Sequence, residues 1–195
     1  MYIYVKRVLD VLVVVLALPL WLPLMIVLAV VVAVTSRGGV FFTQKRYKRG
    51  RRFFTIYKFR SMRVDAPKDV PTHMLENPGA HITGIGRFLR RTSLDELPQV
   101  INILRGDISL VGPRPALWNQ EDLISEREKY GANDIPVGLT GLAQVQGRDE
   151  LPIEVKAAFD GEYAEKIGFI LDVKILFRTV WVAISGRGMK EGGRS

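Results

Sequence analysis

Cysteine is absent from the 195-residue chain, and histidine occurs only twice, as His73 and His81. The missing thiols exclude disulfide frameworks, thiolate zinc sites and thiol nucleophiles. With two histidines, a histidine-rich metal site is not expected, and a histidine-based catalytic triad would have to use one of them. Several classes of site are therefore excluded before any motif is considered.

Acidic residues are the minority charge, with 20 Asp and Glu against 28 Lys and Arg, which gives a net charge of +8. Such an excess favours anionic partners, namely nucleic acid, phosphorylated small molecules or an anionic membrane surface. Hydrophobic residues make up 48% of the chain. The length and composition fit one domain with its own core.

Charge is missing altogether from residues 11–34, VLVVVLALPLWLPLMIVLAVVVAV. A straight helix of this length would cross the ~30 Å hydrocarbon core of a bilayer. Pro19 and Pro23 lie in the middle of the segment. Each proline lacks an amide hydrogen and clashes with the preceding turn, which predicts a kink near residues 18–19.

Basic residues flank both ends of this apolar segment. Lys6 and Arg7 precede it, and the residues that follow it are Arg37, Lys45, Arg46, Lys48, Arg49, Arg51 and Arg52. Because positive segments tend to stay on the cytoplasmic side, both ends favour the same side. A re-entrant helix that bends at the prolines satisfies both observations, and a kinked helix that spans the membrane is the alternative. A cleaved signal peptide is not favoured, since the apolar run is too long and lacks a small-x-small site.

Residues 40–62 alternate as two strands around a basic turn at Gly50, which predicts a β-hairpin. In the second strand, the residues that share one face are Phe54, Ile56, Lys58 and Arg60. Lys58 and Arg60 should therefore point toward one place. The alternative is a solvated edge strand, where basic residues deter aggregation.

Helical patterns occupy most of the remaining chain. They are predicted at residues 85–91, 97–104, 116–130, 153–166 and 169–184, with a loop over residues 63–82. The last helix has a broad apolar face, which either packs on a core or lies along a membrane interface. The predicted fold class is α+β, mainly helical, with one small β-hairpin.

Two adjacent acids, Asp95 and Glu96, lie in the stretch RRTSLDELPQ at residues 90–99. Ser93 and Glu96 have the spacing of a helix capping box, and Asp95 would favour the positive end of the helix dipole. Capping and chemistry are compatible here, because phosphate and metal sites often form at the start of a helix.

Two later motifs also have two readings. Arg114 lies between two prolines in GPRP, which suits a fixed guanidinium fork for a phosphate but is also found in ordinary turns. Gly138, Gly141 and Gly147 punctuate VGLTGLAQVQGR, which ends at Arg148. These glycines would let backbone approach a ligand, or they would simply form turns.

In this order, the motifs resemble those of a known family. They are YKFRSM, RRTSLDELPQVINILRGDISLVGPRP, GLTGLAQVQGR and LDVKI, and they follow a membrane segment with a central proline. The chain resembles the bacterial sugar transferases, the small monotopic phosphoglycosyl transferases, from about Lys6 to Glu191. Two departures are visible: Leu18 stands where such proteins often have serine, and Val137 stands in a position that is usually part of a basic-Pro-Gly motif.

The resemblance implies a re-entrant membrane helix over residues 1–36, a catalytic domain over residues 37–195 and amphipathic helices at the membrane interface. It implies transfer of a sugar-1-phosphate from a UDP-sugar to polyprenyl phosphate, normally undecaprenyl phosphate, with release of UMP. It also implies Mg²⁺, a phospholipid bilayer as partner, no nucleic acid, and a place on the cytoplasmic face of the bacterial inner membrane. The sugar, the pathway and the oligomeric state stay open.

The family's catalytic pair falls on Asp95 and Glu96, which we also expect to be the metal ligands. Asp95 is predicted to attack the β-phosphate and form a covalent intermediate, with Glu96 in a supporting role as metal ligand or base. Phosphoryl transfer needs positive charge around the phosphates, and the predicted contacts are Lys58, Arg60, Arg90, Arg114 and Arg148. The competing hypothesis is a membrane-tethered binder of anionic lipid or nucleic acid without catalysis, which leaves the acid pair unexplained.

Overall fold

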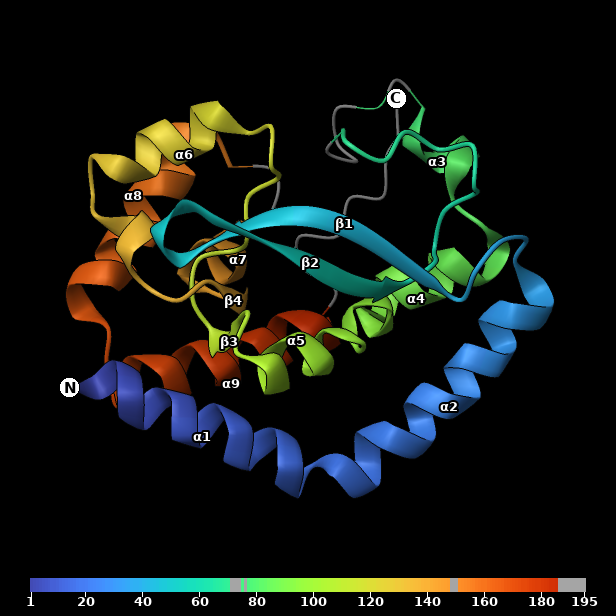
Figure 1. Ribbon diagram of the computed structural model, residues 1–195, viewed down its shortest axis with the longest axis horizontal. Helices are drawn as coiled ribbons and strands as arrows, with labels where there is room; N and C mark the ends of the chain where they lie inside the picture. Colours follow the sequence, from blue (N-terminus) through green and yellow to red (C-terminus); the bar gives the residue numbers. More distant parts are fainter. Residues whose placement is uncertain (71–74, 76, 148–150, 186–195) are drawn as a thin grey trace.

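Helices dominate the computed structural model, which describes residues 1–70, 75, 77–147 and 151–185 (Figure 1). Two small sheets of two strands each lie among the helices. The mainly helical fold with a small hairpin is therefore confirmed.

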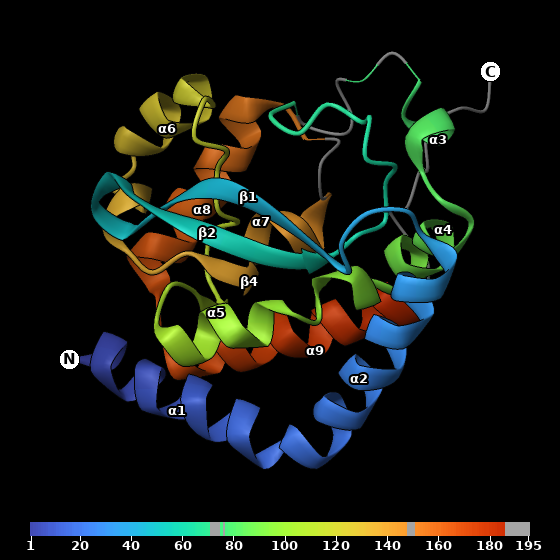
Figure 2. The same cartoon turned by 45° about the vertical axis from the view of Figure 1, so that its right-hand side comes forward.

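Two N-terminal helices, α1 (Tyr2–Leu16) and α2 (Leu18–Thr35), meet at Ala17. Figures 1 and 2 show them as one bent arm along one side of the molecule. Pro19 lies in the first turn of α2, where a missing amide hydrogen costs nothing, and Pro23 lies inside the helix. The indole of Trp21 donates a hydrogen bond of 2.8 Å to the carbonyl of Val14 across the bend. The predicted kink is therefore confirmed, one to two residues earlier than expected.

Among the described residues, α2 is the one helix that is long and apolar enough to cross a membrane. The uncharged segment of residues 11–34 is divided between α1 and α2 rather than forming one continuous helix.

The basic residues of α1 hold this helix against the rest of the protein. Lys6 is 2% exposed, and its Nζ lies 2.6 Å from Oδ2 of Asp172. Arg7 donates to the carbonyls of Ile103 and Leu104, at the C-terminal end of α5 (Gln99–Arg105). These two residues were expected to form a basic membrane flank. Instead, they make contacts within the protein because α1 packs beside α5.

The hairpin consists of β1 (Phe41–Lys48) and β2 (Arg52–Phe59), joined by a turn, η1 (Arg49–Arg51). Gly50 has a φ of 68°, a left-handed conformation that glycine adopts easily, so the predicted turn is confirmed. The antiparallel register places Phe42 opposite Lys58 and Gln44 opposite Ile56. Directly opposed residues share a face of the sheet, so this register brings residues of both strands to the side on which Lys58 lies.

The five predicted helices are all present, and several shorter helices and strands were not predicted. The remaining elements are α3 (Pro78–His81), α4 (Gly84–Thr92), η3 (Leu94–Glu96), α5, β3 (Ser109–Val111), α6 (Glu121–Glu128), η4 (Ala132–Asp134), β4 (Gly138–Thr140), α7 (Leu142–Gln146), α8 (Ile153–Lys166) and α9 (Phe169–Ser185). The helix predicted over residues 116–130 is wrong in its first part. Leu117 pairs with Arg46 of β1 in an isolated β-bridge, so the chain is extended there and becomes helical only at Glu121.

Strands β3 and β4 pair in parallel, and glycines make the approach possible. A Cβ atom on Gly138 would lie 2.1 Å from the backbone nitrogen of Gly112, and one on Gly141 would lie 2.2 Å from the carbonyl oxygen of Gly112. The close approach that was predicted for a ligand is thus an approach of backbone to backbone. It holds the GPRP loop against the segment that carries β4.

Candidate active site

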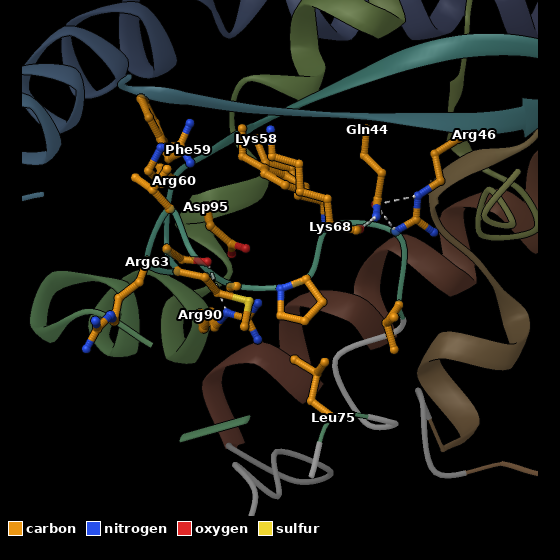
Figure 3. A pocket seen from close by; sticks show the side chains of 17 residues that line it. Gln44, Arg46, Lys58, Phe59, Arg60, Arg63, Lys68, Leu75, Arg90 and Asp95 are labelled. Carbon is orange, nitrogen blue, oxygen red and sulfur yellow. Dashed lines mark hydrogen bonds between the residues drawn. The ribbon is translucent and has the colours of Figure 1, made fainter. Parts of the chain in front are cut away.

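A basic pocket lies beside the hairpin, between β1, β2, the segment that follows β2, and α4 (Figure 3). Its empty volume is about 720 Å³, which includes space open to solvent. Its cationic lining residues are Arg46, Lys58, Arg60, Arg63, Lys68 and Arg90. Asp95 is the one carboxylate among the described residues that line it. Such an excess of positive charge around a single acid suits phosphate groups.

The two adjacent acids lie on η3, a short turn between α4 and α5. Ser93 precedes it with a left-handed φ of 57°, and its side chain caps nothing. The predicted capping box of Ser93 and Glu96 is therefore wrong, because the chain reverses at Ser93 instead of entering a helix in an extended conformation. Thr83 caps α4 instead, and its hydroxyl accepts a hydrogen bond of 3.0 Å from the amide of Gly86.

Glu96 is held by two cations from distant parts of the chain. Its Oε1 accepts hydrogen bonds of 2.7 Å from Nζ of Lys58 and 2.7 Å from Nη2 of Arg114. Burial alone would raise the pKa of Glu96, but Arg114 and Lys58 outweigh it and hold this pKa well below its usual range. Glu96 is therefore a fixed anion that links β2 to the GPRP loop.

Asp95 has a different environment from its neighbour. It is 8% exposed, and Figure 3 shows its carboxylate pointing into the pocket. Burial raises the pKa of Asp95 against the attraction of Lys58, and the charge of Glu96 adds to the rise. Lys58, Arg90 and Arg114 favour the ionised form of Asp95, but desolvation is the stronger effect.

Few side chains in the site could act as ligands of a metal ion. The described residues contain no group of three or more His, Asp or Glu side chains that could hold one. Mg²⁺ often takes only one or two carboxylates together with substrate phosphates, and Asp95 fits that arrangement. Glu96 fits less well, because Arg114 contacts both of its oxygens, Lys58 contacts Oε1, and these cations would repel a metal ion.

The other predicted phosphate contacts are distributed around the acids. Lys58, Arg60 and Arg90 all line the pocket, while Arg114 contacts Glu96. Arg60 donates to the carbonyl of Gly39 at 2.7 Å, and Nε of Arg90 donates to the hydroxyl of Ser61 at 3.0 Å. Arg148 lies outside the described residues.

Sequence reasoning missed five polar residues of the pocket, which are Gln44, Arg46, Ser61, Arg63 and Lys68. Gln44 and Arg46 could have been found from the sequence. They lie two residues apart on one face of β1, just as Lys58 and Arg60 lie two residues apart on one face of β2. Arg63 and Lys68 lie in a segment without periodicity, so their places follow only from the tertiary structure.

Comparison with known proteins shows the family. The family model described as "Bacterial sugar transferase" matches residues 1–186. The chain belongs to the bacterial sugar transferase family. It is therefore a transferase, as its motifs predicted, and the competing hypothesis of a binder without catalysis loses its support.

Several members of the bacterial sugar transferase family are similar to the chain. The exopolysaccharide production protein ExoY of Sinorhizobium fredii is 32% identical over 94% of this chain and 87% of its own length. The undecaprenyl-phosphate galactose phosphotransferase of Salmonella typhimurium is 35% identical over 80% of this chain and 36% of its own length. The UDP-glucose:undecaprenyl-phosphate glucose-1-phosphate transferase of Escherichia coli is 39% identical over 90% of this chain and 39% of its own length. The last two relatives are thus much longer than the part that this sugar transferase matches.

Proposed function

We propose that this sugar transferase moves a sugar-1-phosphate from a UDP-sugar to polyprenyl phosphate and releases UMP. The observation that carries the proposal is the buried carboxylate of Asp95 at a pocket whose described lining residues include six cations. The names of the Salmonella and Escherichia relatives support undecaprenyl phosphate as the acceptor, and the Escherichia name supports a UDP-sugar donor.

The proposed reaction has two displacements at one phosphorus atom. A carboxylate oxygen of Asp95 attacks the β-phosphorus of the UDP-sugar, and the bond to the bridging oxygen breaks, so that UMP leaves with both electrons of that bond. A phosphate oxygen of polyprenyl phosphate then attacks the phosphorus of the aspartyl-phospho-sugar. The Asp95 carboxylate is released, and the product is polyprenyl-diphospho-sugar.

Lys58 and Arg90 are positioned to bind the donor's phosphates, because both line the pocket into which Asp95 points. Glu96 is assigned a role in holding Lys58 and Arg114 beside Asp95. A general base needs a pKa near the working pH, and the low pKa of Glu96 argues against that role.

When bound, Mg²⁺ would be held by Asp95 and the donor's phosphates and would neutralise part of their charge.

Membrane attachment through α1 and α2 is part of the proposal. Their exposed large apolar residues include Tyr4, Val8, Leu16, Leu20, Ile26, Val27, Val30 and Val34. Helix α9 adds a second exposed apolar group, formed by Phe169, Ile170, Phe177, Val180 and Trp181. Such surfaces are expected to contact lipid rather than water.

The two ends of the bent arm support a re-entrant topology. Near its start, Lys6 pairs with Asp172 and Arg7 binds the end of α5. At the other end, Leu28 and Val32 of α2 pack in one cluster with Phe59 and Leu89. A spanning helix would place its ends on opposite faces of a ~30 Å core, whereas here both ends contact one domain. We infer that the domain over residues 37–195 lies on the cytoplasmic face.

Release of UMP tests the proposed function. The purified protein in detergent is incubated with individual UDP-sugars, Mg²⁺ and undecaprenyl phosphate, and UMP is measured. We expect UMP to form with at least one UDP-sugar, together with a lipid-linked sugar diphosphate. A folded protein that releases no UMP from any UDP-sugar in the panel would contradict the proposed donor class.

A further inference from the structure

The GPRP loop is held from outside rather than by its own hydrogen bonds. Its prolines have no amide hydrogen, so they cannot donate within the loop. Nevertheless, four consecutive carbonyls accept hydrogen bonds from other elements. The pairs are Pro113 with the amide of Gly138 at 2.8 Å, Arg114 with Arg127 at 3.0 Å, Pro115 with Arg46 at 2.9 Å and Ala116 with the amide of Tyr47 at 2.9 Å.

Arg127 stands out among these donors because it is a buried charge. It lies on α6 and is 3% exposed. Its Nε and Nη2 donate to Oδ2 of Asp160 at 2.8 and 2.6 Å, and the same Nη2 donates to the carbonyl of Arg114. Asp160 lies on α8 and is 1% exposed. Arg127 therefore joins two helices to the backbone of Arg114.

Stability alone is a weak explanation for such a pair. Burying two charges carries a large desolvation cost, and well-packed apolar residues often stabilise a fold as well or better. A guanidinium holds two acceptors in a fixed planar geometry, whereas a lysine ammonium donates from one freely rotating nitrogen and an apolar side chain does not donate. This geometry is used here, with one acceptor on α8 and one in the GPRP loop.

The side chain of Arg114 needs an external constraint of this kind. It is 34% exposed, so burial does not fix its position. Its Nη2 nevertheless lies 2.7 Å from Oε1 of Glu96, the oxygen that also accepts from Lys58. Because the Arg114 side chain is long and flexible, the place of its guanidinium depends on where its backbone is held.

We propose that Arg127, anchored by Asp160, is a positioning residue for the sugar-phosphate transfer. It fixes the backbone at Arg114 so that the Arg114 guanidinium meets Glu96 beside the nucleophile Asp95. This inference rests on the proposed function, because it assigns Arg127 to the same reaction. Arg127 itself is not among the described residues that line the basic pocket.

The test compares Arg127→Lys with Arg114→Lys and with the double variant. Arg127→Lys keeps the charge opposite Asp160 but loses the fork, and we expect kcat to fall by roughly 10- to 100-fold, as for a misplaced catalytic group. KM for the UDP-sugar should change by less than kcat. The matched control is Arg51→Lys. Arg51 forms an exposed ion pair with Glu128, the residue next to Arg127. The kcat of the Arg51→Lys protein should stay within about twofold of that of the unmodified protein.

The double variant distinguishes positioning from general loosening of the fold. If Arg127 acts through Arg114, adding Arg127→Lys to Arg114→Lys should lower kcat by no more than about twofold further, since neighbours that share one role are not additive. Independent effects that multiply in the double variant would contradict the proposal. So would a folded Arg127→Lys protein with unchanged kcat.

A second variant covers the case in which Arg127→Lys fails to fold. Arg127→Met combined with Asp160→Leu removes both charges and leaves no buried ion unpaired. A cooperative thermal transition with the same loss of kcat supports the inference, and full activity overturns it. Absence of UMP release by the unmodified protein would instead overturn the proposed function, so the two failures are distinguishable.

Discussion

Asp95 and Glu96 are neighbours in the chain with opposite electrostatic environments. The pKa of Asp95 is raised, chiefly by burial, whereas Arg114 and Lys58 hold the pKa of Glu96 low. A carboxyl group whose pKa rises on folding is less stable as an anion in the folded protein than in the unfolded chain. Ionised Asp95 therefore costs stability, while ionised Glu96 contributes it.

These shifts predict opposite effects for the two amide substitutions. At pH 7, Asp95→Asn should leave the free energy of unfolding unchanged or raise it, because the cost of the buried charge disappears. Glu96→Gln should lower it by roughly 1–3 kcal/mol, since Lys58 and Arg114 lose a charged partner. Denaturant unfolding in detergent, without added metal ion, measures both values.

The pH dependence gives the control for this pair. The cost of ionised Asp95 to the free energy of unfolding arises as the pH increases above the unfolded pKa of about 3.9. The gain in that free energy from Asp95→Asn should therefore disappear toward lower pH. The contribution of Glu96 is present above its unfolded pKa of about 4.3 and is lost as the pH falls below it. Equal destabilisation by both substitutions at neutral pH would contradict these environments.

Individual site residues could be predicted from the sequence more readily than the residues that they contact. Asp95, Glu96, Lys58 and Arg114 were all predicted to be site residues, yet the contact of the last two with Glu96 was not. Lys58 lies 38 residues before Glu96 and Arg114 lies 18 after it. Local patterns report faces and turns, whereas such pairs depend on how distant elements pack.

Among the elements, the glycines between the GPRP loop and β4 set a tight packing constraint. A Cβ atom on Gly138 would meet backbone atoms of Val111 and Gly112, which cannot move aside as a flexible side chain would. By contrast, a Cβ atom on Gly84, at the start of α4, would meet no atom within 4 Å. Both glycines lack the positive φ that would strain an alanine, so they form a matched pair.

We therefore expect Gly138→Ala to lower the free energy of unfolding by roughly 1–3 kcal/mol or more, as overpacking does. Gly84→Ala should be neutral or slightly stabilising, because alanine restricts the unfolded chain. Thermal and denaturant unfolding of both variants measures the difference. A Gly138→Ala protein as stable as Gly84→Ala would show that β3 and β4 do not approach as closely as described.

The longer helices and the hairpin could be predicted with many of their bounds, whereas the short elements α3, β3, β4 and α7 and the contacts between elements could not. The helix over residues 153–166 and the hairpin around Gly50 follow from periodicity and turn chemistry. The capping box failed because Ser93 reverses the chain, and the helix predicted from residue 116 failed because Leu117 pairs with β1. In both cases, a tertiary contact or a turn decided against the local preference.

At the scale of the whole molecule, the proposed membrane topology rests on the bent arm formed by α1 and α2. Both of its ends contact the same domain, through Lys6 and Arg7 near its start and through Leu28 and Val32 near its end. We expect the N-terminus and the hairpin turn to lie on the same side of the membrane. The chain contains no cysteine, so single cysteines can report this directly.

One cysteine is added ahead of Tyr2 and another replaces Arg49, in separate proteins. An impermeant thiol reagent should label both in inside-out vesicles and neither in right-side-out vesicles. Replacing Pro19 and Pro23 together by alanine should shift part of the population toward a spanning helix, since it restores the missing amide donors. Labelling of the two positions from opposite sides in the unmodified sequence would exclude the re-entrant topology.

The central claim is that Asp95 carries the sugar phosphate during transfer, and trapping of that intermediate tests it most directly. The protein is incubated with a UDP-sugar labelled in the sugar and without polyprenyl phosphate, then denatured, and the label bound to protein is counted. The account predicts label on the unmodified protein, matched by release of UMP, and none on Asp95→Asn. Label retained by Asp95→Asn, or no label on an unmodified protein that forms product when the acceptor is added, would contradict it.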